Sequence, residues 1–202
     1  MGLLTVIRKQ KIKDKEIRVL MLGLDNAGKT TLVKSILHED VTTISPTLGF
    51  NIRTIQHGQY KLNIWDVGGQ STLRPFWRNY FEKTDTLVWV VDATATDRLP
   101  DCKVELNKVL DEDRLKGAGL LILVNKLDMI PEQEQEETVA RIRAMLGLPE
   151  DSDVNKDANN DNSTVTFHES KVLGCSAFTR MNLDVALDWI VDEVKARLYL
   201  LE

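Results

Sequence analysis

The sequence predicts an α/β domain in which helices cover both faces of a doubly wound, mostly parallel sheet. Six apolar runs typical of strands alternate with segments of helical periodicity, as expected for a parallel sheet. Two neighbouring runs, residues 49–55 and 60–66, are joined by a short polar turn and predict a hairpin. One of the six strands should therefore be antiparallel, and a ligand should bind at the carboxyl ends of the others.

Composition and charge exclude several classes of protein. The chain has 202 residues, of which 43% are hydrophobic, enough for one domain with a full core. Its net charge of −5 argues against general nucleic-acid binding. No apolar run approaches the length of a membrane span, and Arg8, Lys9 and Lys11 follow too short an apolar start for a signal peptide. We therefore expect a cytoplasmic protein.

The start of the chain predicts a short amphipathic helix. Leu3, Leu4 and Ile7 fall on one side of a helical wheel, and basic residues lie opposite. A helix this short is unstable alone in water, so it packs on the domain, makes a weak or transient membrane contact, or frays. We divide the chain into this helix, at 1–15, and a domain at 16–202.

A glycine-containing segment follows the first predicted strand. Residues 23–30 fit the phosphate-binding pattern G-x-x-x-x-G-K-[ST], between a strand at 17–22 and a helix at 31–37. Its glycines allow a tight turn, and the loop amides and the helix N-terminus face phosphate oxygens. Lys29 can reach the β- and γ-phosphates, and the Thr30 hydroxyl can ligate Mg²⁺. The nucleotide-binding residues predicted here are Gly23, Asp25, Asn26, Ala27, Gly28, Lys29, Thr30 and Thr31. The alternative is an ordinary strand-to-helix turn.

The predicted hairpin, whose turn spans 56–59, ends in a second pair of glycines. Asp66 closes its second strand, and Gly68 and Gly69 follow. An aspartate at a strand end can hold Mg²⁺ through water, and glycines there let the backbone approach a γ-phosphate. Gln70 comes next, where a glutamine can orient an attacking water. A solvated loop glutamine is the alternative.

The middle of the chain continues the alternation of strands and helices. Residues 73–81 are unusually aromatic and basic at helical spacing, so part of this segment should pack in the core and part should form a partner surface. A buried strand at 86–92, a helix at 98–115 and a strand at 120–124 follow.

The pattern Asn-Lys-Leu-Asp at 125–128 predicts recognition of guanine. A carboxylate at Asp128 can accept two hydrogen bonds from a donor pair of guanine that adenine lacks. Adenine would leave this buried carboxylate unpaired, and that cost makes such a site selective for guanine. Residues 172–177 predict a last strand and the loop that follows it, where the Ala177 amide could bind the guanine oxygen. The base-binding residues predicted here are Asn125, Lys126, Asp128, Ser176 and Ala177.

The rest of the second half predicts two helices and one insert. A helix should span 132–146, and a second should begin at Asn182. Between them, residues 150–163 are acidic and nearly free of apolar side chains, so we expect a flexible surface insert.

These motifs, in this order, resemble those of the small GTPases, and most of all the ADP-ribosylation factor family and its factor-like branch. The resemblance rests on Gly-Leu-Asp-Asn-Ala-Gly-Lys-Thr at 23–30, Pro-Thr-Leu-Gly-Phe-Asn at 46–51, Trp-Asp-Val-Gly-Gly-Gln at 65–70 and Trp-Arg-Asn-Tyr-Phe at 77–81. It covers nearly the whole chain. Leu127 replaces the glutamine usual in this branch, and the acidic insert is extra.

The resemblance implies a six-stranded P-loop small GTPase fold and further roles in the site. Thr47 would ligate Mg²⁺ with Thr30 and bind the γ-phosphate through its amide, to which Gly69 would also donate. Phe50, Trp65 and Tyr80 would form an effector surface. The cofactors would be GTP or GDP and Mg²⁺.

The resemblance also implies a monomeric GTP/GDP switch that hydrolyses GTP slowly. An activating protein similar to tubulin cofactor C would supply an arginine finger. Partners similar to tubulin cofactor D and prenyl-binding carriers would be effectors, in tubulin folding, microtubule biogenesis and release of lipidated cargo. The protein would be cytoplasmic, and microtubules or centrosomes are possible sites. The alternatives are a GTP-bound scaffold that does not hydrolyse, a membrane-trafficking GTPase of the same family, and a P-loop ATPase or kinase.

Overall fold

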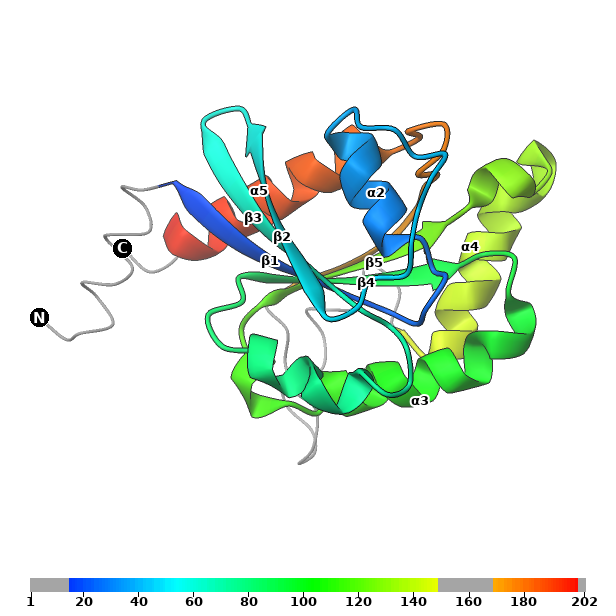
Figure 1. Cartoon of the computed structure of the whole chain (residues 1–202), viewed down its shortest axis with the longest axis horizontal. Helices are drawn as coiled ribbons and strands as arrows, with labels where there is room; N and C mark the ends of the chain where they lie inside the picture. The colour runs from blue at the N-terminus through cyan, green and yellow to red at the C-terminus, as the bar shows by residue number, and fades with distance from the viewer. Residues whose placement is uncertain (1–14, 149–168, 200–202) are drawn as a thin grey trace, which may run out of the picture.

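The computed structural model describes residues 15–148 and 169–199, and their core is one six-stranded sheet (Figure 1). The strands lie in the order β2-β3-β1-β4-β5-β6. All neighbours are parallel except β2 and β3, which form an antiparallel hairpin. The strands are β1 (Glu16–Leu22), β2 (Phe50–His57), β3 (Tyr60–Val67), β4 (Thr86–Asp92), β5 (Gly119–Asn125) and β6 (Ser170–Gly174). The predicted fold class is confirmed.

Helices cover both faces of the sheet because successive strand residues point to opposite sides. On β1, Val19 and Met21 join one core, under helices α2 and α5, while Leu20 and Leu22 join a second core, under α3, α4 and the 3₁₀ helix η1. Figure 1 shows these two layers above and below the strands. The helices are α2 (Lys29–Ile36), α3 (Leu99–Leu110), α4 (Glu132–Leu146), α5 (Leu183–Tyr199), η1 (Arg74–Tyr80), η2 (Thr96–Arg98), η3 (Asp113–Leu115) and η4 (Leu127–Met129).

Two predicted boundaries are wrong for identifiable reasons. The hairpin turn is shorter than 56–59, because the strands pair as far as His57 and Tyr60 and the positive φ of 55° at Gly58 closes the turn. The helix predicted at 98–115 ends at Leu110, because Glu112 is extended, and a short 3₁₀ helix then brings Leu115 into the core. Leu115 thus fits the helical spacing of apolar residues in the sequence, although it is not part of the helix.

Two predicted segments lie outside the described residues. These are the N-terminal helix at 1–15, except for its last residue, and the acidic insert at 150–163. Within the described residues, none of the helices has the length and apolar character needed to cross a bilayer.

A carboxyl group is buried at the amino end of the central strands. Glu193 on α5 is 2% exposed and fills the space beside Gly119, where an added Cβ would lie 2.6 Å from its Oε2. Its Oε1 lies 3.6 Å from Nε of Arg197, one helical turn away. Burial raises the pKa of Glu193 to about 7, against the opposing effect of Arg197 and with the help of Glu169 and Asp85.

This raised pKa makes the stability of the fold depend on pH. Protonated Glu193 contributes stability that is complete below its ordinary pKa of 4.5 and is lost as the pH rises through about 7. Between pH 6 and pH 8 the loss should be about 1 kcal/mol. Glu193→Gln stays neutral and should lack this loss, measured as the free energy of unfolding in urea at both pH values. Asp192→Asn, an exposed neighbour, is the control. A gap between wild type and Glu193→Gln that is equal at pH 6 and pH 8 would contradict the assignment.

Candidate functional site

The loop from Gly23 to Gly28 joins β1 to α2 and touches the neighbouring strands at two glycines. Gly23 has a φ of 139°, and a Cβ there would lie 2.3 Å from the Val90 carbonyl oxygen on β4. Gly28 has a φ of 93°, and a Cβ there would lie 2.3 Å from Nδ2 of Asn125 at the end of β5. Both positions therefore require glycine, for conformation and for space.

A buried ammonium group lies across this loop. Lys29 is 6% exposed, and its Nζ donates to the carbonyl oxygens of Gly23, at 2.9 Å, and Leu24, at 2.8 Å. Burial lowers the pKa of Lys29 to about 8, although Asp66 and Asp25 oppose the shift. The loop thus holds a cation among its own carbonyls, where an anion of several charges would be attracted.

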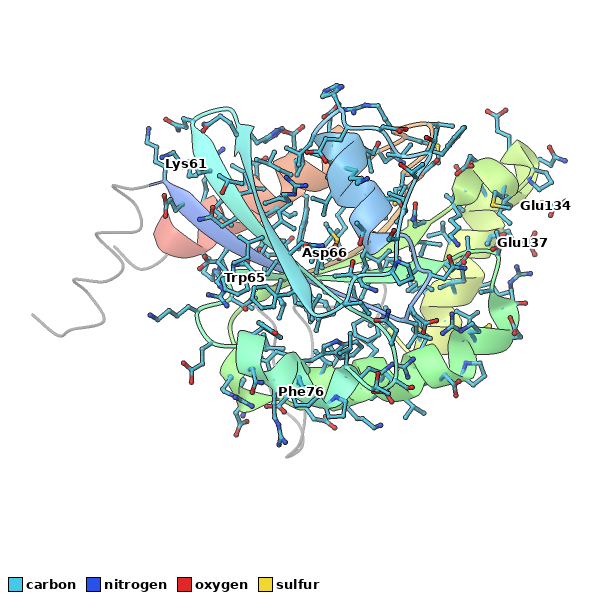
Figure 2. The ribbon with its side chains drawn as sticks, viewed as in Figure 1. Lys61, Trp65, Asp66, Phe76, Glu134 and Glu137 are labelled. Atoms are coloured by element: carbon cyan, nitrogen blue, oxygen red, sulfur yellow. The ribbon has the colours of Figure 1, made fainter. Side chains whose placement is uncertain are left out.

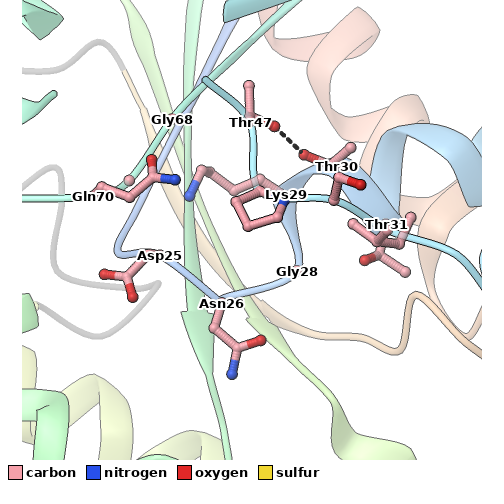
Figure 3. Close-up of a pocket in the computed structure, with 13 residues that line it drawn as sticks. Asp25, Asn26, Gly28, Lys29, Thr30, Thr31, Thr47, Gly68 and Gln70 are labelled. Carbon is pink, nitrogen blue, oxygen red and sulfur yellow. Dashed lines mark hydrogen bonds between the residues drawn. The ribbon is translucent and has the colours of Figure 1, made fainter. Parts of the chain in front are cut away.

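Three side-chain oxygens from separate segments meet beside Lys29. The Thr30 hydroxyl donates to Oδ2 of Asp66 at 2.6 Å. It also lies 2.8 Å from the Thr47 hydroxyl, as Figure 3 shows. Asp66 is 1% exposed, and burial raises its pKa against the hydrogen bond from Thr30 and the charge of Lys29. Among the described residues no group of three or more His, Cys, Asp and Glu could hold a metal. Two hydroxyls and one carboxylate suit Mg²⁺, which takes few protein oxygens and completes its shell with phosphates and water. The donor set therefore fits the predicted ion.

The loop after β3 packs against the loop after β1. A Cβ on Gly69 would lie 2.4 Å from the Asp25 amide nitrogen, and a Cβ on Gly68 would lie 2.5 Å from the Thr47 carbonyl oxygen. The Gly68 amide donates to the Gly49 carbonyl at 2.8 Å, and the buried indole of Trp77 donates to the Gly68 carbonyl at 2.9 Å. The segments carrying Asp25, Thr47 and Gly69 are thus held together.

These segments surround a cavity of about 330 Å³ (Figure 3). Nine predicted site residues line it: Asp25, Asn26, Gly28, Lys29, Thr30, Thr31, Thr47, Gly69 and Gln70. Gly23 and Ala27 do not line it, although both take part through their carbonyl oxygens. Ile44, Ser45, Pro46 and Gly68 line it too, and the position of the first three just before Thr47 could have indicated this.

The predicted base-binding residues form a second group at the ends of β5 and β6. Asn125 is 1% exposed; its Nδ2 donates to the Ala27 carbonyl, and its Oδ1 accepts from the Ala177 amide, both at 2.9 Å. The Ser176 hydroxyl donates to Oδ1 of Asp128 at 2.5 Å. Because the Ala177 amide is bound to Asn125 here, its contact with a guanine oxygen stays a prediction.

Two arginines that the sequence did not point to hold Asp25. Arg98 donates to its Oδ1 at 2.7 Å and to its carbonyl oxygen at 2.8 Å, and Arg74 lies 3.5 Å from the same Oδ1. Burial alone would raise the pKa of Asp25, but the hydrogen bond and charge of Arg98, with the charge of Arg74, lower it. A similar ion pair joins Lys126 to Asp92 at 2.5 Å. These pairs link residues 34 to 73 positions apart, so no local motif could have shown them.

A cluster of three aromatic rings lies on the other side of β3. Trp65 and Asp66 are neighbours on this strand (Figure 2), so their side chains leave opposite faces of the sheet. The Phe50 ring stacks on Trp65 at 5.5 Å and lies 5.2 Å from Tyr80, and the Arg18 guanidinium lies 4.0 Å from the Trp65 ring. Phe50 is 45% exposed, so the cluster reaches the surface.

Comparison with known proteins identifies the family. The model of the ADP-ribosylation factor family matches residues 3–194. The chain belongs to this family. It is 49% identical to ADP-ribosylation factor-like protein 2 of Arabidopsis thaliana and 45% identical to that of Dictyostelium discoideum, over all of each chain.

A solved structure shares the fold. It is the Arl6 BBS3 small GTPase of Trypanosoma brucei with the bound nucleotide analogue GppNp, with a TM-score of 0.69 at 22% identity, covering 90% of this chain and 99% of that one. The chain is thus a small GTPase similar to ADP-ribosylation factor-like protein 2, which binds GTP and GDP with Mg²⁺ and hydrolyses GTP.

Thr30→Asn should weaken binding of Mg²⁺–GTP and favour GDP or the empty protein, because it removes one of the three clustered oxygens. The affinity for Mg²⁺–GTP should fall by more than about tenfold. A loss of about tenfold is the lower end of the range for residues that only orient the metal ligands, and Thr30 is itself a predicted ligand. Titration of a fluorescent GTP analogue at several Mg²⁺ concentrations measures the change. Thr54→Asn, which alters an exposed hydroxyl on β2, is the matched control. Unchanged affinity with an unchanged dependence on Mg²⁺ would remove Thr30 from the metal site.

Proposed function

We propose that this GTPase is a switch in tubulin folding, microtubule biogenesis and the release of lipidated cargo from carriers. Its similarity to ADP-ribosylation factor-like protein 2 across the entire chain carries the proposal. It would act in the cytoplasm, with microtubules or centrosomes as possible sites, as a monomer whose contact with membranes is weak or transient.

In the proposed mechanism, the chain binds the phosphates at one end of the site and the guanine at the other. The loop amides and Lys29 bind phosphate oxygens. Thr30 and Thr47 would hold Mg²⁺, with Asp66 acting through water, and the ion would supply positive charge that neutralises the phosphates. The amides of Thr47 and Gly69 meet the γ-phosphate, and Gln70, which lines the cavity, orients the attacking water.

At the base end, Asp128 accepts from guanine and Lys126 borders the base. Asn125 joins the loop carrying Ala27 to the loop carrying Ala177. The hydroxyl of Ser176 orients the carboxylate of Asp128. A fixed carboxylate of this kind favours guanine over adenine, because only guanine offers two adjacent donors. This argues against the ATPase or kinase alternative.

An activating protein completes the site. Within the described residues no arginine lines the cavity, and Arg74 and Arg98 are paired with the lining residue Asp25. An arginine finger contributed by a partner accelerates hydrolysis in GTPases by about 10³–10⁵. We assign this role to a protein similar to tubulin cofactor C.

The aromatic cluster is the proposed effector surface. Exposed apolar residues adjoin this cluster. Ile52, 46% exposed, pairs with Trp65 across the hairpin, and Phe76, 57% exposed, belongs to the same 3₁₀ helix as Tyr80. Leu48, two residues before Phe50, is 88% exposed. Exposed apolar patches of this kind mark protein interfaces. Partners similar to tubulin cofactor D and to prenyl-binding carriers would bind here. A membrane-trafficking GTPase would use the same surface for other partners.

Gln70→Leu should keep GTP binding and lower the activated hydrolysis rate by roughly 10²-fold, because water is no longer oriented. Single-turnover hydrolysis with a protein similar to tubulin cofactor C measures the rate. Gln133→Leu, an exposed glutamine on α4, is the control. If Gln70→Leu hydrolysed GTP at the wild-type rate with the activator, Gln70 would not be the residue that orients the water.

Phe50→Ala should weaken binding of the proteins similar to cofactor D and to the prenyl-binding carriers by about tenfold or more, as loss of a central aromatic residue does at interfaces. Isothermal titration with protein loaded with a non-hydrolysable GTP analogue or with GDP tests both the surface and the nucleotide dependence. Val104→Ala, on the exposed side of α3, should bind normally. Equal binding in both nucleotide states would argue against a switch, and no binding of these partners would argue against the pathway.

A further inference from the structure

Arg74 touches three segments that the proposed mechanism brings together. It is the first residue of η1, and its side chain is 16% exposed. Its Nε donates to the Gly69 carbonyl at 2.9 Å, its Nη2 lies 3.5 Å from Oδ1 of Asp25, and its Nη1 lies 3.8 Å from Oε1 of Glu105 on α3. One guanidinium thus joins the loop after β3 to the loop after β1 and to a helix.

The contacts of Arg74 fix the backbone on both sides of Gln70. Its side chain binds the carbonyl before Gln70, and its own amide, with that of Leu73, donates to the carbonyl of Gln70 at 3.3 and 2.8 Å. A peptide unit is planar, so holding its carbonyl oxygen also sets the direction of its N–H group. Both peptide planes that flank Gln70 therefore have a fixed orientation. This also fixes the direction of the Cα–Cβ bond of Gln70.

The anchor of Arg74 is itself held in place. Asp25 accepts from Arg98 at 2.7 Å, and Glu105 pairs with Lys108 at 2.9 Å. Arg74 does not line the phosphate cavity but a groove between η1 and α3. Its guanidinium is engaged by oxygens of Gly69, Asp25 and Glu105, so it is not an internal arginine finger.

We infer that Arg74 is a positioning residue for GTP hydrolysis, which aims Gln70 by holding the Gly69 carbonyl and with it the peptide plane that precedes Gln70. A displacement of about 1 Å at a reacting group can lower a rate 10²-fold. Loss of the contacts should therefore slow bond cleavage while the residues that bind phosphate and base stay in place. Since the role of Gln70 is itself part of the proposed function, the two must be tested together.

The test compares Arg74→Gln with Arg78→Gln, which alters an exposed arginine of the same 3₁₀ helix. For Arg74→Gln we expect single-turnover hydrolysis without an activator to fall by roughly 10- to 100-fold, with the release rates of fluorescent GDP and GTP analogues changed less than about threefold. Arg78→Gln should match the wild type in both measurements. A normal hydrolysis rate in Arg74→Gln, or a fall in rate matched by an equal change in nucleotide release, would overturn the inference.

Arg74→Lys separates geometry from charge and serves if Arg74→Gln folds poorly. A lysine keeps the charge but has no planar fork to bind Gly69, Asp25 and Glu105 at once. Its hydrolysis rate should stay well below that of the wild type, and full recovery would overturn the inference.

Gln70→Leu distinguishes a failure of this inference from a failure of the proposed mechanism. If Gln70→Leu hydrolyses slowly and Arg74→Gln normally, only the role of Arg74 is wrong. If Gln70→Leu is normal, the role of Gln70 is wrong, and that of Arg74 with it. In the double variant, the two losses should not add, because a leucine has nothing to aim.

Discussion

The site depends on the close approach of the glycine pair Gly68–Gly69 to the backbone of Gly23–Asp25. A single Cβ on Gly69 would meet three backbone atoms of the facing loop at 2.4–2.5 Å. Backbone cannot move aside as the end of a long side chain can, so the contact requires that Gly69 has no side chain. The contact brings the loop that carries Gly69 and Gln70 against the loop that carries Asp25.

Hydrogen bonds from two residues of η1 keep this contact in place. Trp77, which is buried, donates to the Gly68 carbonyl, and Arg74, which is part-buried, donates to the Gly69 carbonyl. The same short helix therefore supports both carbonyls of the glycine pair. Its aromatic and basic composition predicted both core packing and a partner surface. Trp77 in the core confirms the first, and the second stays a prediction, for which Phe76, 57% exposed, is available (Figure 2).

Features that depend on neighbours in the chain could be predicted, and those that depend on distant partners could not. The bounds of β4 and α4 agree with the predicted ranges, because apolar runs and helical periodicity are local. The loop at 23–30 was found because its chemistry needs fixed residue types at fixed spacing. The pairing of Arg98 with Asp25 spans 73 positions and uses charges that look like ordinary surface residues in the sequence. Only the folded chain shows that they belong to the site.

Different interactions hold the two ends of the site, and the two ends therefore differ in rigidity. At the base end, Asn125 ties two loops to each other through bonds within the protein, and Ser176 does the same for Asp128. At the phosphate end, the oxygens of Thr30, Thr47 and Asp66 are brought together in a way that suits a cation. The base end can therefore keep its shape when the nucleotide leaves and another binds, whereas the shape of the phosphate end depends on the ion that it binds.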